Sequence, residues 1–181
     1  MTAWVLPATN DYSLPYLIDG SIGVINYSLQ LGTEGDSSGY FYSYATKNGI
    51  DGFPHHAQSN VKAGDWCHLA MTVSAKGNVR LYKNGKEIGS AKKLYKISST
   101  PFSGNIGGIP DEPSLSNFNG KMAWLSIYDS SLSPVEINTD MIQGEGNRTV
   151  SFRRSFPIDF QVYSINNNDQ VQAIYIDNTG V

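Results

Sequence analysis

Asp51, His55 and His56 are the residues of this sequence whose types and spacing most readily suggest chemistry. They lie in one short stretch, Gly49 to His56, together with an aromatic ring. A carboxylate beside two imidazoles could transfer protons, hold a metal ion or accept hydrogen bonds from ligand hydroxyl groups. Adjacent histidines in an extended segment point to opposite faces, so this pair lacks the usual spacing of zinc ligands. We therefore expect hydrogen bonding to a ligand, and no zinc.

The acidic residues do not form the pair that cleavage of a glycosidic bond requires. Glycoside hydrolases place two carboxyl groups on either side of the bond. No strand that we predict carries alternating acidic residues, and Asp111 and Glu112 are neighbours in a loop, so their side chains should point apart. Cys67 lies in an apolar run, which favours a buried small side chain over a nucleophile. The sequence predicts a protein without catalytic activity, with a glycoside hydrolase or a polysaccharide lyase as the less favoured alternative.

Oxygen-bearing side chains in one loop suit calcium. This ion takes six to eight oxygen ligands from carboxylates, amides and backbone carbonyls. The loop from Gly108 to Asn119 contains Asp111, Glu112 and Asn117. These three residues are our candidate metal ligands, and calcium is the cofactor that they indicate. The alternative is a solvated loop that its two prolines turn.

Alternation of apolar and polar residues is the dominant pattern along the chain. In the run from Trp66 to Val73, every second residue is apolar, as in a strand with one face in a core. Asn84-Gly85 has the composition of a tight hairpin turn. Further strands are predicted at residues 3–6, 16–18, 27–31, 40–46, 78–82, 102–106, 122–128, 160–165 and 171–176. Many short strands separated by turn residues predict an all-β sandwich.

One helix is predicted at residues 134–143. Ser133 and Glu136 form a capping box, and a proline occupies the first helical position between them. The apolar residues Ile137, Met141 and Ile142 should form the stripe that faces the core. Gly144 should end the helix.

Composition and charge exclude several classes of protein. The 181 residues suffice for one domain. The net charge is −3, and the only cationic cluster is Lys86 to Lys96, so we expect no nucleic acid partner. No long apolar run is present, so we expect no membrane insertion. We find no signal peptide in the chain as given, which leaves a cytoplasmic protein, release by a non-classical route, or a domain of a larger protein.

Four pieces in order resemble the laminin-G-like jelly roll of the concanavalin A-like lectin and glucanase superfamily. They are Trp66 with His68 at a strand start, the hairpin Leu81 to Gly85, the strand end Ile106 to Gly108, and the segment Phe118 to Ile137. The resemblance covers about residues 3 to 143. It implies a two-sheet antiparallel jelly-roll sandwich with one short helix near 134–143, in which Trp66 opens a core strand.

The beginning and the end of the chain depart from that family pattern. The segment Thr2 to Pro7 resembles one that family members carry after an initial strand or two. We therefore expect a single domain over residues 1–181, in which the C-terminal extension 147–181 supplies the additional strands. The alternative is that the extension pairs with a second subunit.

Aromatic and polar side chains outside the predicted core indicate a carbohydrate-binding protein. Sugars stack on aromatic rings while carboxylates, amides and backbone groups bind their hydroxyls. Tyr40, Tyr42 and Tyr44 share one face of a predicted strand, and Trp124 lies on the face opposite Ala123, although other residues could cover it. The candidate ligand contacts are Asp36, Tyr40, Tyr42, Asp51, His55, His56, Asn117, Asn119 and Trp124.

The sequence thus predicts a lectin-like protein that binds glycans or glycoconjugates without cleaving them. The alternative is a protein–protein adhesion or receptor-binding module of a larger toxin or surface protein. A single shallow sugar site binds weakly, so we expect several sites to act together, for example in a homo-oligomer.

Overall fold

The computed structural model describes the backbone over eleven segments of the chain. They are residues 1–8, 16–22, 25–33, 39–47, 55–91, 102–107, 118–128, 130–146, 151–152, 158–162 and 175–176. Side chains are described for residues 1–8, 61–90, 105–107, 118–128 and 130–145.

Strands make up most of the described chain, as the period-two pattern predicts. The elements before residue 100 are β1 (Thr2–Pro7), β2 (Tyr16–Ile22), β3 (Ile25–Thr33), β4 (Gly39–Lys47), β5 (His55–Val61), β6 (Cys67–Val73), β7 (Val79–Lys83) and β8 (Lys86–Ala91). Those after it are β9 (Phe102–Ile106), β10 (Gly120–Ser126), α2 (Pro134–Gly146), β11 (Ser151–Phe152), β12 (Ile158–Val162) and β13 (Tyr175–Ile176). Asn84 and Gly85 have φ angles of 47° and 75°, which confirms the predicted tight turn between β7 and β8.

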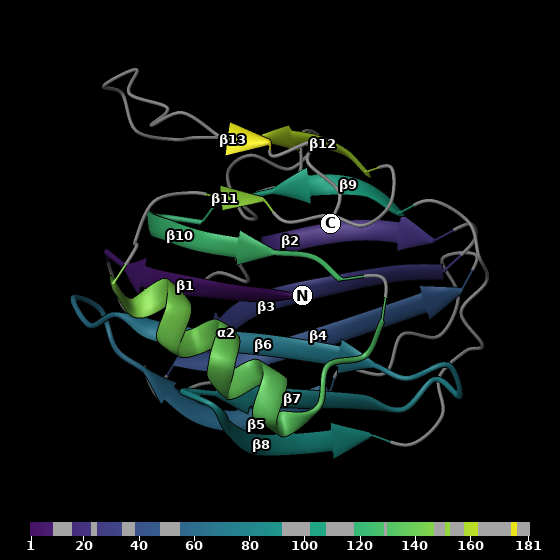
Figure 1. Ribbon diagram of the computed structural model, residues 1–181, viewed down its shortest axis with the longest axis horizontal. Helices are drawn as coiled ribbons and strands as arrows, with labels where there is room; N and C mark the ends of the chain where they lie inside the picture. The colour runs from purple at the N-terminus through teal and green to yellow at the C-terminus, as the bar shows by residue number, and fades with distance from the viewer. Residues whose placement is uncertain are drawn as a thin grey trace.

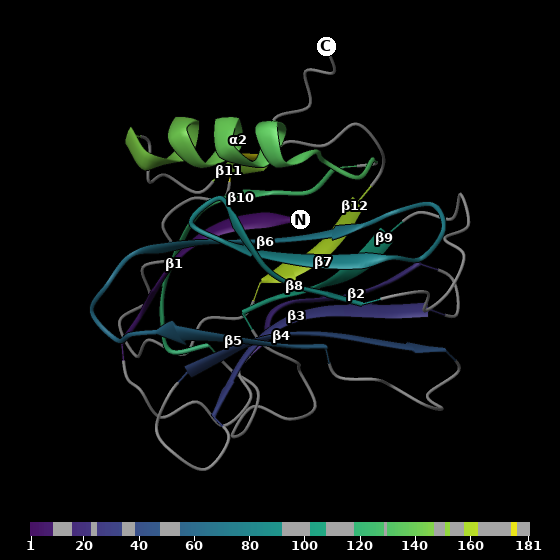
Figure 2. The same ribbon diagram turned by 90° about the horizontal axis from the view of Figure 1, so that it is seen from below.

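Two sheets stack face to face, and α2 forms a third layer on one of them (Figure 2). The five-stranded sheet has the order β10-β1-β6-β7-β8, and all its neighbouring strands are antiparallel. The six-stranded sheet has the order β12-β9-β2-β3-β4-β5. Its pairs are antiparallel except β12 with β9, which is parallel. This arrangement confirms the jelly-roll sandwich that the sequence predicts.

The main core lies on the face of the five-stranded sheet that is turned toward the other sheet. Every second residue of β6 faces this core, and Cys67, Leu69 and Met71 are at most 4% exposed. Burial raises the pKa of the Cys67 thiol to about 12. A protonated, inaccessible thiol is a poor nucleophile, so this cysteine is a packing residue, as its surroundings in the sequence indicate.

Helix α2 crosses the outer face of the five-stranded sheet, in front of β1 and β6 (Figure 1). The predicted capping box is present at its start: the Ser133 amide donates to Glu136 Oε2 over 2.7 Å, and the Glu136 amide donates to Ser133 Oγ over 3.3 Å. These bonds satisfy two amides that the helix itself leaves unpaired.

The buried stripe of α2 differs from the predicted one. Ile137 is fully buried and Met141 is half-buried, but Ile142 is 64% exposed. The stripe is completed instead by Asp140 and Gly144, which follow the three- and four-residue spacing of a helix face. Gly144 does not end the helix, which continues to Gly146.

Gly144 has a packing role in place of the predicted role as a stop. A β-carbon placed on it would lie 2.6 Å from Trp124 Cδ1 and 2.8 Å from Trp4 Cδ1. The glycine therefore lets the last turns of α2 approach two tryptophan rings more closely than any other residue would allow.

Candidate functional site

The predicted ligand and metal residues fall into three groups in the structure. Five of them lie outside the described residues: Asp36, Asp51, Asp111, Glu112 and Asn117. Asn119 is exposed just before β10, and its carbonyl accepts a 2.9 Å hydrogen bond from the Ala8 amide. Tyr40, Tyr42, His55 and His56 lie in strands β4 and β5, and Trp124 lies in β10. Within the described residues, no three His, Cys, Asp or Glu side chains gather as a metal site would require.

Trp124 must be removed from the candidate sugar contacts. It is 7% exposed and packs with Trp4 and Ala123 under α2, where Met141 covers the cluster. Its φ of 49° is unusual for a bulky residue, and it lies in a bulge where β10 has one residue more than β1 between paired positions. Because of this bulge Ala123 also joins the helix side, against the strict alternation that we predicted. Trp66, expected in the sandwich core, is half-buried against the same cluster.

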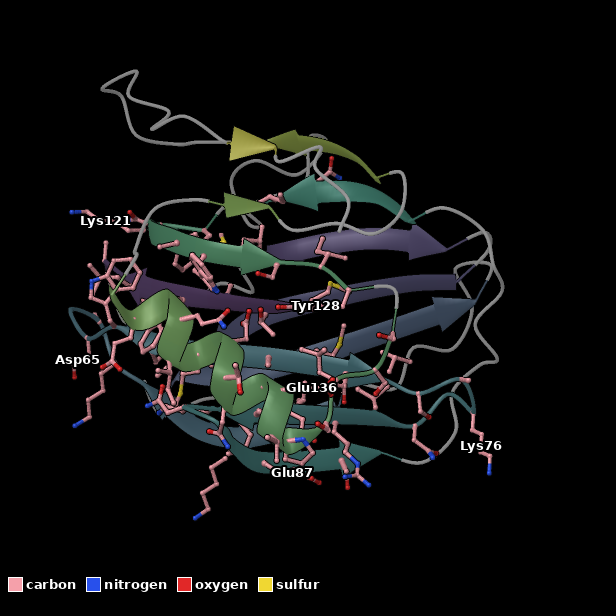
Figure 3. All side chains as sticks on the ribbon, in the orientation of Figure 1. Asp65, Lys76, Glu87, Lys121, Tyr128 and Glu136 are labelled. Carbon is pink, nitrogen blue, oxygen red and sulfur yellow. The ribbon has the colours of Figure 1, made fainter. Side chains whose placement is uncertain are left out.

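A buried polar cluster around Asp140 lies on the helix side of the five-stranded sheet and contains residue types that are common in active sites. His68 Nε2 lies 3.3 Å from Asp140 Oδ2, and both residues are at most 5% exposed. Trp124 Nε1 donates to Asp140 Oδ1 over 3.2 Å, and Tyr128 Oη donates to the same oxygen over 2.5 Å. Tyr128 lies on the segment that leads from β10 to α2, beside the helix in this view (Figure 3).

Electrostatics show why Asp140 tolerates its position. Burial alone would raise its pKa, but hydrogen bonds from His68 and Tyr128, the nearby hydroxyl of Thr2 and the attraction of His68 together hold the pKa below its ordinary value. The Thr2 hydroxyl is close enough to contribute to this effect, although it does not meet the geometry of a hydrogen bond. The carboxylate is therefore charged and multiply bonded.

An aspartate beside a histidine could serve in acid–base catalysis if a substrate reached it. Here the side chain of His68 is 0% exposed and that of Asp140 is 5% exposed. The pair is sealed between α2 and the sheet, and its carboxylate is already occupied by three donors. Its chemistry in this structure is to fasten the helix to the sheet.

The outer face of the six-stranded sheet is the second place where polar residues gather. Its face assignment is fixed by two described core side chains, because Val61 is 2% exposed and Ile106 is 6% exposed. Val61 pairs with Gly39, and Ile106 pairs with Ile18 and Val162. Since successive residues of a strand alternate between faces, the remaining positions belong to the outer face. Asn105, next to Ile106, is half-exposed, as this assignment requires.

The outer-face positions form rows that cross the strands. One unbroken row pairs a residue from each of five strands in turn: Tyr44, Ser28, Asp19, Asn105 and Gln161. A second row beside it contains Thr46, Asn26, Ser21, Ser103 and Asp159. A third row contains His56, Tyr42, Gln30 and Tyr16. The face is thus made of hydroxyl, amide, carboxylate and aromatic residue types, while the opposite positions are mostly apolar.

Three of the predicted contacts share this face. Tyr42 pairs directly with His56, and Tyr40 occupies an equivalent position two residues away on β4. His55 pairs with Ser43 and therefore occupies a position of the inward face. No strand was predicted at the two histidines, whereas β5 begins at His55.

Several residues of the rows were missed, among them Asp19, Ser28, Gln30, Asn105 and Gln161. The signal that could have found them was present, because β3 alternates strictly in the run from Ile25 to Leu31. What the sequence does not reveal is that β2, β9 and β12 lie side by side and align their polar positions in one row. Pairing between strands distant in sequence sets that register.

The chain belongs to the concanavalin A-like lectin/glucanases superfamily. The family model, a laminin-G-type domain, matches residues 1–138. This match includes both sheets except β12, and it ends inside α2. No curated protein sequence matches the chain.

Three solved structures share the fold at low sequence identity. A heptameric SAP-like pentraxin from Limulus polyphemus matches with a TM-score of 0.56 and 16% identity, over 76% of this chain and 66% of its own. A putative carbohydrate binding protein from Bacteroides ovatus gives 0.57 and 17%, over 76% and 38%. Domain 4 of AbnA, a GH43 extracellular arabinanase from Geobacillus stearothermophilus solved with arabinotriose, gives 0.53 and 18%, over 77% and 64%. This chain thus spans less than two thirds of each of these structures.

Proposed function

We propose that this protein binds glycans without cleaving them, and that it does so on the outer face of the six-stranded sheet. The observation that carries the proposal is the set of aligned rows. They contain the aromatic, amide and carboxylate residue types that bind sugars, for example Tyr42, Gln30 and Asp19. Aromatic rings stack on the C–H faces of sugars, and amides and carboxylates bind their hydroxyls. No described helix or strand covers this face (Figure 2).

Known structures support the carbohydrate class. One of the three similar structures is described as a putative carbohydrate binding protein, and another contains arabinotriose. Each is under 20% identical to this chain, so the likeness concerns the fold, and the ligand class is our inference from the rows. The described helices include none with the length and apolar character that a membrane span requires.

The placement of the acidic residues supports binding without catalysis. Asp19 and Asp159 are the only acidic residues in the six strands of this sheet. They are separated by two strand spacings and two residues, about 12 Å between backbone positions by ordinary sheet geometry. Glycoside hydrolases hold their two carboxyl groups about 5 to 9.5 Å apart, which is closer than these two backbone positions. Incubation of the pure protein with the glycans it binds, followed by chromatography, should release no products.

A glycan array followed by calorimetry tests the binding function. We expect Gln30→Ala and Tyr42→Ala each to lower the affinity for the best glycan of the array about tenfold. Gln143→Ala is the matched control for Gln30→Ala, because Gln143 is exposed on α2 at the far side of the molecule. An array without any bound glycan, or affinity unchanged by both variants of the face, would count against this proposal.

Calcium and self-association belong to the same proposal. The expected calcium ligands Asp111, Glu112 and Asn117 lie outside the described residues, so calcium dependence remains a prediction. The array should be run with added calcium and with EDTA. Analytical ultracentrifugation of the full chain tests whether several sites are joined in an oligomer, as weak individual sites would require.

A further inference from the structure

The six-stranded sheet has an uneven distribution of charge. Across its strands the sequence contains two aspartates and a single cation, Lys47. Lys47 pairs with Ile25 at the end of β4, a position of the inward face. Asp19 and Asp159 both occupy outer-face positions. The outer-face positions of the described strands therefore carry carboxylates and no lysine or arginine.

The two carboxylates lie within the rows, where a bound chain would contact them. Asp19 is the middle member of the first row, between Ser28 and Asn105. Asp159 lies in the adjacent row beside Ser103. A ligand that follows either row across the strands would pass over one of these two positions.

We propose that this face selects glycans by charge, accepting neutral or amine-bearing chains and rejecting chains rich in carboxylate or sulfate groups. This inference rests on the proposed glycan-binding function and names the ligand class of the same site. A carboxylate accepts hydrogen bonds from sugar hydroxyls and ion-pairs with an ammonium group. It only repels a uronic acid or a sulfate.

The rejection has two physical sources. An acidic glycan would place like charges within a few ångströms of Asp19, closer than the screening length of about 8 Å at physiological salt. It would also have to leave water without finding a lysine or arginine on the rows of the described strands, and an unpaired charge is costly to desolvate. The net charge of −3 on the whole chain acts in the same direction.

Matched glycan pairs that differ only in charge provide the test. The array should carry oligogalacturonate with its methyl ester, glucosamine oligomers with their N-acetylated forms, and sulfated with desulfated galactan fragments. For each pair that gives binding, we expect one member to bind at least fivefold more tightly in 20 mM salt. This member is the methyl ester, the glucosamine oligomer with free amines, or the desulfated galactan fragment. The difference should shrink in 300 mM salt, because screening weakens the repulsion.

The variant Asp19→Asn, combined with Asp159→Asn, should lower the ratio of affinities between the two members of each charged pair at least threefold, whatever its effect on the affinity for the neutral members. Asp65→Asn is the matched control, since Asp65 is exposed at an end of the five-stranded sheet (Figure 3). Equal or tighter binding of the acidic members, or unchanged discrimination in the double variant, would overturn the charge selection and leave glycan binding standing. Absence of binding to every member would overturn the proposed function itself.

Discussion

The two outer faces of this sandwich both carry polar residues, but these residues have opposite surroundings. On the five-stranded sheet, α2 covers the polar groups, and three donors converge on the carboxylate of Asp140. On the six-stranded sheet, polar positions align in rows that no described helix or strand covers. A buried carboxylate with satisfied bonds stabilises a protein, whereas donors and acceptors that the described elements leave uncovered can bind a ligand. The same residue types thus have different roles, depending on whether a helix covers them.

Among variants that separate the two faces, Asp140→Ala is expected to have the largest effect, a loss of folding stability. Removing the carboxylate leaves His68 and the Trp124 indole buried without their acceptor, which should cost about 3 to 5 kcal/mol of folding free energy. Urea denaturation measures it, with Glu145→Ala, an exposed acidic residue on the same helix, as the control. A loss below about 1 kcal/mol would mean that the cluster does not fasten the helix.

Gly144→Ala should have the next largest effect. The added methyl group would overlap the rings of Trp124 and Trp4, and overpacking of this kind typically costs about 1 to 3 kcal/mol. The alanine otherwise favours a helix, so destabilisation can be assigned to the contact. Gln143→Ala, one position earlier and exposed, is the control, and a Gly144→Ala protein as stable as the wild type would contradict the close approach.

Variants of the other face should show the reverse behaviour. Tyr42→Ala should weaken glycan binding about tenfold, or about 1.4 kcal/mol. Asp140→Asn should leave the affinity for glycan unchanged under conditions in which the protein is folded. Calorimetry and thermal denaturation of both variants make this a crossed experiment. Equal losses of affinity in both would show that the two faces are not separate in function.

The smallest expected effect is on the pH dependence of stability. The folded-state pKa of Asp140 is lowered, so its contribution to stability is complete above its unfolded value of about 4 and disappears as the pH falls through the folded value. Stability measured between pH 5 and pH 2 should fall less steeply in Asp140→Asn than in the wild type. The α-amino group of Met1, whose pKa burial lowers to about 6, titrates above this window. Parallel curves for both proteins would refute the assignment.

Local sequence patterns predicted the parts of the fold that depend on neighbouring residues. The alternation in β6, the turn at Asn84-Gly85 and the capping box at Ser133 are each written within a few residues, and each is present. The strand β5 was missed because its first residues follow a run of turn formers. The inward position of Asp140 was missed because a helix-face prediction excludes a charged residue unless its partners from distant strands are known.

The candidate site was harder to predict because it depends on long-range register. Tyr42 and His56 were selected one by one from their own segments, and only the pairing of β4 with β5 places them beside each other. The bulge at Trp124 had the opposite effect, because one extra residue turned an expected surface ring into a core residue. Both outcomes follow from contacts between residues far apart in the chain, which periodicity does not encode.

The strand β12 has a consequence for how this surface could diverge among relatives. It joins the edge of the six-stranded sheet beside β9 from a part of the chain that follows the family match, which ends at residue 138. Gln161 and Asp159 extend two rows by one position each. Ile158, Phe160 and Val162 of this strand occupy inward positions, so only its two outer-face residues can be replaced without repacking the interior. The outermost contacts of the surface are therefore set by two positions that lie outside the shared scaffold.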